Sequence, residues 1–415
     1  MFYKAIVIGA GPAGLFAAYN LSENGVSTLV IEKNKQLGRK LLVSGNGQCN
    51  FTNASKLETF TNKYGDNFSF IKHALNTFTN KDSMNFFNSC GIELEIANSN
   101  KVFPKSRNSE DILGALVKSS KLNGTQIKAG IIIDKIIEYD GIFQISTIES
   151  GENESFTTEN LIIATGGSSY SHLGTDGFGY EVAKQFGHKI MPIRSSLTNI
   201  IANEDIYFSL SGVSFKNVEL IIWRNGKKIK EKTDDLIFTH TGISGPVILN
   251  SSRWIQENDL LTFNLINKPY EILQKELEIG LNKYGKEQIG TYLKRFEFPK
   301  SFIGILLSIL DIAPDLKCAN ISKQERKQIA MYITKMPITV KKVGDLKNAM
   351  VTAGGVSLKE VNPTTFESRK QKGLYFVGEV LDIDADTGGY NIQAAMSMGC
   401  VCANNIVRKE KLNVH

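Results

Sequence analysis

Cysteine is scarce in this sequence of 415 residues. Its five cysteines are Cys49, Cys90, Cys318, Cys400 and Cys402, and no two of them form a Cys-x-x-Cys pair. An odd count without paired spacing argues against a disulfide-stapled secreted scaffold and gives no zinc-binding pattern. We therefore expect free thiols, a cytoplasmic location and no metal site.

Long apolar runs are missing as well. The most apolar stretch, Phe302 to Leu310, stops at Asp311 and is much shorter than the roughly 18 residues that span a bilayer. The first residues do not resemble a secretory signal, because Ala5 to Ile8 already read as a buried strand. We expect no membrane partner.

Charge of one sign is not concentrated. The 48 Lys and Arg residues against 42 Asp and Glu residues give a net charge of +6. The longest basic stretches, 227–230 and 341–342, are short, whereas a dedicated nucleic-acid binder usually carries a basic stripe. The expected partner is a small-molecule substrate rather than nucleic acid, and the oligomeric state stays open.

The first 32 residues predict a dinucleotide-binding β-α-β unit. The apolar run 4–9 leads into Gly9-Ala10-Gly11-Pro12-Ala13-Gly14, a helical pattern follows, and a second apolar run ends at Glu32. In such a unit the first glycine permits a tight turn, the second lets backbone approach a pyrophosphate, and the third lets the helix pack on the strand. Glu32 is placed to accept ribose hydroxyl groups.

The rest of the chain predicts an α/β fold in three parts. Both chain ends, 1–190 and 350–415, form a Rossmann-like nucleotide-binding domain, and the late glycine clusters and a family resemblance make it an FAD-binding domain of the glutathione-reductase type. A β-rich insert on the substrate side covers 191–267 and 335–349, and 268–334 form a helical subdomain. Residues 33–53 read as a long irregular loop, and Asn225-Gly226 marks a hairpin.

The late glycine clusters favour FAD over NAD. A strand ends in Ala164-Thr165-Gly166-Gly167, and another late strand ends at Gly378 and Glu379. A chain that returns at its C-terminus to complete the cofactor site implies an elongated ligand. Glu379 and Asp382 are placed for ribityl hydroxyls or water, and the helix after Gly388-Gly389 for the flavin ring.

Three segments resemble the HI0933-like (BaiN/YhiN-like) family of FAD-dependent oxidoreductases. These are residues 38–53, GRKLLVSGNGQCNFTN, residues 238–246, FTHTGISGP, and the glycine-rich stretches between 354 and 393. The resemblance implies FAD, a two-electron redox enzyme and a covering insert, without fixing a substrate. The family pattern usually has Arg where this chain has Gln48, which puts any anion preference in doubt.

The predicted site follows from these motifs. His240 is the candidate catalytic proton donor, although a turn-stabilising role is equally compatible with its place between two threonines. Cys49 is expected to pack against the flavin loop rather than to form a redox disulfide. The predicted cofactor-binding residues are Gly9, Gly11, Pro12, Ala13, Gly14, Glu32, Lys33, Arg39, Lys40, Ser44, Gly45, Gly47, Asn50, Ile131, Ala164, Thr165, Gly166, Gly378, Glu379, Asp382, Gly389, Tyr390, Asn391 and Ile392.

The predicted chemistry is two-electron hydride transfer at flavin N5. No second strand-GxGxxG-helix unit is found, so NAD(P)H is expected as a transient electron donor without a domain of its own. An amine or aminoketone oxidase that passes electrons to oxygen is one alternative. A flavin-dependent RNA-modifying enzyme and a flavin-binding module without turnover are the others.

Overall fold

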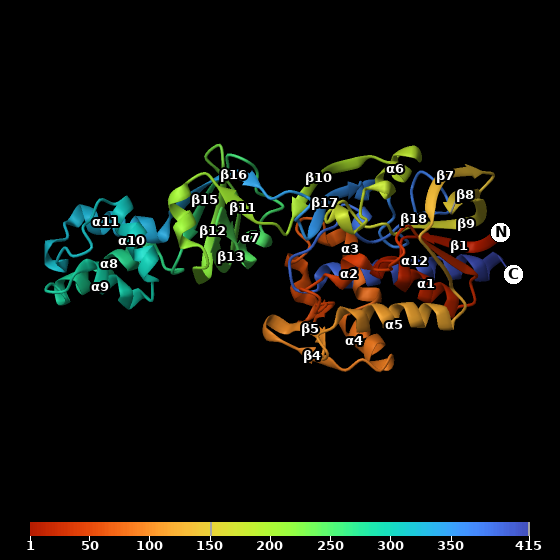
Figure 1. The fold of residues 1–415 in the computed structure, drawn as a ribbon, viewed down its shortest axis with the longest axis horizontal. Helices are drawn as coiled ribbons and strands as arrows, with labels where there is room; N and C mark the ends of the chain where they lie inside the picture. The colour runs from red at the N-terminus through yellow and green to blue at the C-terminus, as the bar shows by residue number, and fades with distance from the viewer. Residues whose placement is uncertain (150–151, 414–415) are drawn as a thin grey trace. The chain divides into compact units, whose positions relative to one another are not determined.

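The computed structural model describes residues 1–149 and 152–413, which form two compact units (Figure 1). One unit is built from both chain ends, Met1–Ser196 and Leu346–His415, and the other from Leu197–Asp345. The finer division of the second unit into two subdomains stays a prediction. Its barrel and its helices share one continuous hydrophobic cluster.

The first unit is organised around a seven-stranded sheet with the order β6-β2-β1-β9-β8-β7, and β18 also pairs with β9. The strands β18, β9, β1, β2 and β6 run parallel, whereas β7, β8 and β9 form an antiparallel meander. The bounds are β1 (Phe2–Ile8), β2 (Thr28–Glu32), β6 (Gln126–Ala129), β7 (Ile132–Tyr139), β8 (Ile142–Glu149), β9 (Glu152–Ile163) and β18 (Leu374–Phe376). The predicted β-α-β unit is confirmed.

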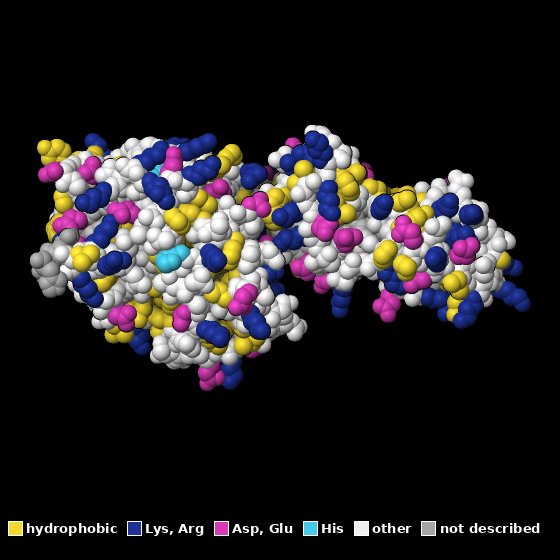
Figure 2. All heavy atoms as spheres, turned by 180° about the vertical axis from the view of Figure 1, so that it is seen from behind, with side chains coloured by type: hydrophobic (Ala, Val, Ile, Leu, Met, Phe, Trp, Pro, Cys, Tyr) yellow, Lys and Arg dark blue, Asp and Glu magenta, His cyan; other side chains and the backbone are white. Residues whose placement is uncertain are grey.

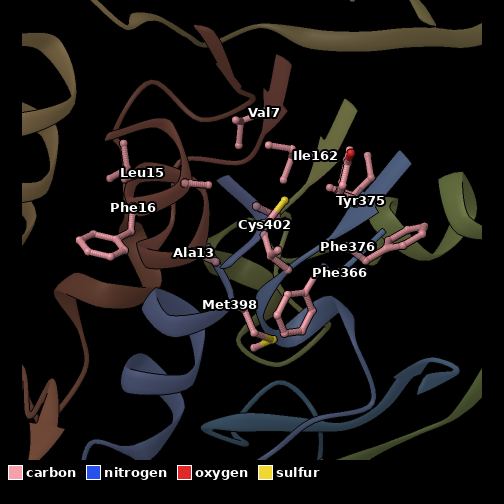
Figure 3. Close-up of a cluster of buried hydrophobic side chains, with 14 of the residues drawn as sticks. Val7, Ala13, Leu15, Phe16, Ile162, Phe366, Tyr375, Phe376, Met398 and Cys402 are labelled. Carbon is pink, nitrogen blue, oxygen red and sulfur yellow. The ribbon is translucent and has the colours of Figure 1, made fainter. Parts of the chain in front are cut away.

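The two ends of the chain meet in this sheet. Tyr375 of β18 pairs with Ile162 of β9, and the same Ile162 pairs with Val7 of β1. The helices α1 (Pro12–Glu23) and α12 (Tyr390–Asn413) pack so closely that a Cβ on Gly399 would lie 2.5 Å from the Ala13 carbonyl oxygen. Figure 3 shows Val7, Ile162, Tyr375 and Cys402 packed together from β1, β9, β18 and α12. A continuous apolar core therefore holds the terminal segments together.

Smaller elements complete the first unit. Thr79 and Asp82 form a capping box that starts α4 as a helix separate from α3. The expected irregular loop 33–53 contains a short helix, α2, and a short strand, β3. The bounds are α2 (Arg39–Leu42), β3 (Thr52–Asn53), α3 (Phe68–Thr77), α4 (Asn80–Ser89), β4 (Leu94–Ile96), β5 (Lys101–Pro104), α5 (Ser109–Leu122), α6 (Phe178–Gln185), β10 (Ile190–Ser196) and β17 (Val351–Val356).

The second unit contains a closed barrel with the strand order β11-β14-β13-β12-β15-β16. Helices of the same unit share one hydrophobic cluster with the barrel. Asn225 (φ 50°) and Gly226 (φ 73°) join β12 to β13, which confirms the predicted hairpin. The strands are β11 (Ile200–Ala202), β12 (Ser214–Arg224), β13 (Lys227–Thr239), β14 (Gly242–Ser244), β15 (Leu260–Asn264) and β16 (Met336–Val343). The helices are α7 (Pro246–Leu249), α8 (Tyr270–Lys283), α9 (Ile289–Tyr292), α10 (Lys300–Ile309) and α11 (Lys323–Thr334).

Candidate FAD-binding site

The loop between β1 and α1 contains three glycines, of which two are closely packed and one faces open space. A Cβ on Gly9 would lie 2.5 Å from the Ala164 carbonyl oxygen, and a Cβ on Gly14 would lie 2.0 Å from the Gly9 carbonyl oxygen. A Cβ on Gly11 would meet nothing within 4 Å. Gly9 and Gly14 therefore serve close packing, and Gly11 borders the space that a ligand can fill.

The start of α1 fits a pyrophosphate. Gly11 is the N-cap residue and gives no side-chain hydrogen bond to the helix, while Pro12 occupies the first turn. The first N–H groups of this 12-residue helix thus carry partial positive charge toward open space. Ala13 and Gly14 are buried in the same turn and fix its backbone. This uncapped helix start, together with the open Gly11, is the feature of the structure that fits FAD.

Glu32 ends β2 beside this loop. Its carboxylate accepts hydrogen bonds from the Ala10 amide (2.9 Å) and from the Asn34 amide (2.9 Å). The next strand is joined to the same residue, because the Ile131 amide donates to the Glu32 carbonyl oxygen (3.1 Å). Glu32 is half-buried and rigidly held where a dinucleotide ribose lies in this fold.

Lys33 and Arg39 are tied to protein groups near Glu32. The Lys33 ammonium pairs with Asp176, whose pKa is lowered. Burial opposes this lowering, and the hydrogen bond from Lys33 favours it. Arg39 donates to the Asn34 side-chain oxygen (3.2 Å). Cofactor contacts by either residue stay a prediction.

Lys40 and Glu379 form a partly buried ion pair. The Lys40 ammonium lies 2.7 and 2.8 Å from the two Glu379 oxygens and 2.6 Å from the Ser169 hydroxyl oxygen. Glu379 also accepts from the Thr352 amide (2.8 Å) and the Ser169 hydroxyl (3.0 Å). Its carboxylate is thus used to position Lys40, and direct contact with ribityl hydroxyls stays a prediction.

Asp382 follows Gly378 and Glu379 in the same segment. Its carboxylate accepts from the Gly354 amide (3.0 Å). Burial, together with the neighbouring Asp384 carboxylate, raises the pKa of Asp382 above its usual value. This carboxylate is therefore easier to protonate than that of an exposed aspartate.

The glycine-rich stretch 44–50 is a turn with several residues of positive φ. Gly45 (56°), Gly47 (82°) and Cys49 (54°) all have left-handed backbone, and the Ser44 hydroxyl donates to the Leu41 carbonyl oxygen (2.7 Å). Cys49 is fully buried, and this burial raises its pKa to about 12. Its thiol is therefore protonated at neutral pH. A protonated, buried thiol suits packing, whereas redox exchange needs an accessible thiolate.

This turn meets the start of α12. The Asn50 side-chain amide, in the orientation that satisfies its neighbours, donates to the Thr52 carbonyl oxygen (2.9 Å) and accepts from the Gly389 amide (3.1 Å). Gly389 has φ of 92°, and a Cβ there would lie 2.4 Å from the Thr52 carbonyl oxygen. The structure therefore brings the segments 44–53 and 388–393 together, although they are far apart in sequence.

The predicted residues of α12 have different surroundings. The Tyr390 ring is buried and meets Phe60 edge to face at 4.9 Å, so this side chain belongs to the core. The Asn391 side chain holds the loop that precedes α12. Its amide oxygen accepts from the Ala385 amide (2.8 Å), and its amide nitrogen donates to the Ala385 carbonyl oxygen (3.0 Å). Ile392 is half-buried. Flavin contact by any of the three stays a prediction.

The strand end at 164–167 holds a buried hydroxyl. Ala164 is buried, Gly166 has φ of 76°, and the Thr165 hydroxyl oxygen is buried without a hydrogen-bond partner among the described residues. Such an orphaned group is costly unless a ligand or water satisfies it. Gly378, two residues after the end of the neighbouring strand β18, also has positive φ (80°).

Sequence reasoning missed three residues that support these groups. Asn34 binds both Glu32 and Arg39, and Ser169 and Thr352 bind the Lys40–Glu379 pair. A signal was present, since Ser169 follows Gly166-Gly167 and Thr352 precedes Gly354-Gly355. Only the packed structure shows which of many such polar residues is used.

His240 lies in the second unit, at the turn between β13 and β14. Its side chain is exposed. The structure thus gives it access to solvent, and its role as proton donor stays a prediction.

The described part of the chain offers neither a metal-binding cluster nor a membrane-spanning helix. Residues 1–149 and 152–413 contain no group of three or more His, Cys, Asp or Glu side chains suited to a metal ion. Within the same ranges, each helix is too short or too polar to cross a membrane.

The comparisons with known proteins agree with this geometry. Residues 3–405 match the family described as HI0933-like protein Rossmann domain. The chain belongs to this family. It is 33% identical to a protein of Haemophilus influenzae named ribosomal RNA dihydrouridine synthase, over 98% of this chain and 99% of the relative. It is 26% identical to the 3-dehydro-bile acid delta(4,6)-reductase of Clostridium scindens, over 95% and 96% of the two chains.

A solved structure supports the fold of the HI0933-like chain. The open conformation of a flavocytochrome c3 fumarate reductase superposes with a TM-score of 0.50 at 14% identity, covering 98% of this chain and 78% of that one. The family and the flavoenzyme fold, together with the uncapped start of α1, identify the chain as an FAD-dependent oxidoreductase.

Proposed function

We propose that this HI0933-like protein reduces a carbon–carbon double bond conjugated to a carbonyl group. Two full-length relatives carry names that share this chemistry. Dihydrouridine is uridine with two hydrogens added across one ring double bond next to a carbonyl. The bile acid reductase is named for double bonds in a 3-dehydro, that is 3-keto, steroid. The common element is a cyclic enone-like acceptor of hydride and proton.

Uracil within RNA is the substrate that we favour over a small enone. The relative with the RNA-directed name is 33% identical, against 26% for the steroid reductase. The expectation of no nucleic-acid partner rested on low charge density alone, and this resemblance is the stronger argument. A free cyclic enone is the second candidate.

Several residues of the predicted FAD-binding site each contact a different part of the cofactor in this proposal. When bound, FAD supplies the hydride that passes from N5 to a substrate carbon. The open N-terminus of α1 holds the pyrophosphate, and Glu32 accepts the ribose hydroxyls. Lys40, fixed by Glu379, places a positive charge within the same unit. His240 donates the proton that completes addition across the double bond.

Reduced nicotinamide is the proposed electron donor. The described residues contain no second strand-GxGxxG-helix unit, so NAD(P)H is expected to bind transiently and leave before the substrate enters. Under the alternative oxidase activity, an amine would bleach the flavin and oxygen would restore its colour. The donor that reduces the flavin anaerobically distinguishes the two activities.

The decisive experiment measures both half-reactions. Purified holoprotein is mixed anaerobically with NADH, NADPH or an amine, and flavin absorbance is followed by stopped flow. The reduced protein is then incubated with ribosomal RNA from a strain lacking this gene, or with a 3-keto-4-ene steroid. A mass gain of two hydrogens in RNA uridine supports the favoured substrate, and a gain in the steroid alone supports the second. Reduction of neither substrate contradicts the proposal.

A further inference from the structure

A groove of about 540 Å³ lies on the outer face of the second unit's barrel. Its floor is a ladder of cross-strand pairs between β12 and β15, namely Trp223 with Leu260, Ile221 with Thr262, and Glu219 with Asn264. These residues point outward because their neighbours along the strand, such as Leu220 and Ile222, are buried in the barrel. The start of α8 forms a wall of the groove.

Two aromatic side chains line the groove. The Trp223 indole N–H donates to the Thr262 hydroxyl oxygen (2.9 Å), which fixes the ring on the floor. Tyr270, the first residue of α8, lines the same groove, and both side chains are partly exposed. The amides of Asn225 and Asn258 lie at the exposed rim. Aromatic faces with amides beside them suit an unpaired nucleobase, which stacks on rings and bonds through its edges.

Basic side chains border the groove, several of them at the β12–β13 hairpin, while Lys335 lines it next to the start of β16. Residues 224–232, RNGKKIKEK, contain five basic residues and one acidic residue, and this hairpin tip borders the groove through Asn225 and Gly226. Lys227 and Lys228 are exposed, and Lys228 shares its charge with Glu231. Figure 2 shows Lys and Arg side chains interspersed with Asp and Glu over much of the face that it draws.

Glu231 and Asp259, the partner of Arg224, lie near this tip, whereas the acidic side chains that line the groove lie farther along it. Glu219 lines the floor four residues before Trp223, which is about 13 Å along an extended strand. Its carboxylate, with that of Glu271, repels phosphate and accepts N–H groups of bases. The exposed lysines of the hairpin therefore suit phosphates, and the floor of the groove suits bases.

We propose that this groove and the β12–β13 hairpin bind a single-stranded segment of the substrate RNA, outside the FAD-binding site. The inference rests on the proposed function with RNA as substrate. It assigns base stacking to Trp223 and Tyr270 and phosphate contacts to Lys227 and Lys228. A small-molecule substrate has no use for such a surface.

The test uses intact holoprotein and a fluorescein-labelled 20-nucleotide oligouridylate as the probe, with binding followed by polarisation between 50 and 200 mM salt. Lys227→Glu/Lys228→Glu is expected to weaken binding and to flatten the log–log salt slope by about 1.4, at about 0.7 for each lost phosphate contact. Tyr270→Ala is expected to weaken binding by about fivefold or more, and Tyr270→Phe to restore it. The matched control is Lys323→Glu/Lys327→Glu, two exposed lysines on α11, with Lys323 about 16 Å from the groove end of that helix.

The outcomes separate this inference from the proposed function. Equal binding by the wild type, the groove variants and the control variant overturns the inference, as does wild type that binds no oligouridylate. Groove-dependent binding by a protein that reduces no uridine keeps the RNA-binding surface and removes RNA as the substrate of the proposed reaction. FAD content and melting temperature are measured for every variant, and a 4-thiouridine probe that crosslinks to Trp223 or Tyr270 gives the same answer without any substitution.

Discussion

The Lys40 ammonium lies 2.7 Å from the Glu379 carboxylate, although the two residues are 339 positions apart. Their side chains are 24% and 19% exposed, so solvent screens the pair only in part. Ser169 and the Thr352 amide complete its hydrogen bonds. The pair thus joins the family's N-terminal motif to its C-terminal motif at the predicted FAD site.

Removing one member of this pair is expected to cost more than removing both. Glu379→Gln leaves a partly buried ammonium without its counter-ion, which costs about 1–3 kcal/mol of stability and weakens FAD binding. Lys40→Met/Glu379→Leu, which leaves no unpaired charge, is expected to recover part of that stability. Thermal melting and FAD titration check this, and equal losses in both variants would contradict it.

Gly11 is expected to matter for FAD and not for folding. Its φ of −85° suits any residue and its Cβ direction is open, so Gly11→Leu places a side chain in the cofactor's space without straining the chain. The matched control is Gly114→Leu on the exposed face of α5, where a Cβ also meets nothing within 4 Å. Circular dichroism should be native for both variants, and flavin absorbance should be lost only for Gly11→Leu. Full FAD occupancy of Gly11→Leu would refute the assignment of the FAD pyrophosphate to the start of α1.

The thiol of Cys49 is expected to be chemically inert. Burial raises its pKa to about 12, so the reactive thiolate forms only in strongly alkaline solution. Cys90 is exposed, whereas the other four cysteines are buried. Ellman's reagent at pH 8 should therefore modify about one thiol per native chain, and Cys49→Ala should still be reduced by NAD(P)H. Loss of flavin reduction in Cys49→Ala would instead indicate a redox thiol.

Asp382 is expected to destabilise the FAD-free protein at neutral pH. Its pKa is raised in the fold, mainly by burial, so protonation is easier in the folded than in the unfolded chain. The stability that this acid contributes is present below its unfolded pKa and is lost as pH rises through the folded value. Asp382→Asn should therefore be more stable than wild type at pH 7, with the difference vanishing toward pH 4. Urea unfolding across this range tests the sign, and a constant difference would exclude titration of Asp382.

His240 is expected to affect only the second half-reaction. His240→Gln removes the proposed proton donor and should slow substrate reduction by about 10²-fold or more. Flavin reduction by NAD(P)H, which does not need that proton, should keep its rate. Single-turnover kinetics of each half-reaction resolve the two steps, and an unchanged substrate rate would leave His240 with a structural role in its turn.

Local patterns predicted much of the fold because they depend on neighbours in sequence. The apolar run before Gly9 and the Asn225-Gly226 turn formed the predicted strand and hairpin. The region 33–53 was harder, because α2 and β3 depend on partners such as Gly38 packed on Leu113 and β3 paired with β5. Leu197, with φ of 52°, likewise lies between β10 and β11 and belongs to neither strand.

The sequence alone determined the chemistry of this protein's cofactor site, because a glycine spacing and a strand-terminal acid act through backbone geometry over about 30 residues. Only the tertiary structure decided which polar groups serve that site. Glu379 is committed to Lys40 and Tyr390 to the core, while Asn34, Ser169 and Thr352 supply the supporting hydrogen bonds. The contacts of Glu379 with Lys40 and Ser169, and of Tyr390 with Phe60, join residues hundreds of positions apart, which come into reach only when the sheet and α12 close around one core.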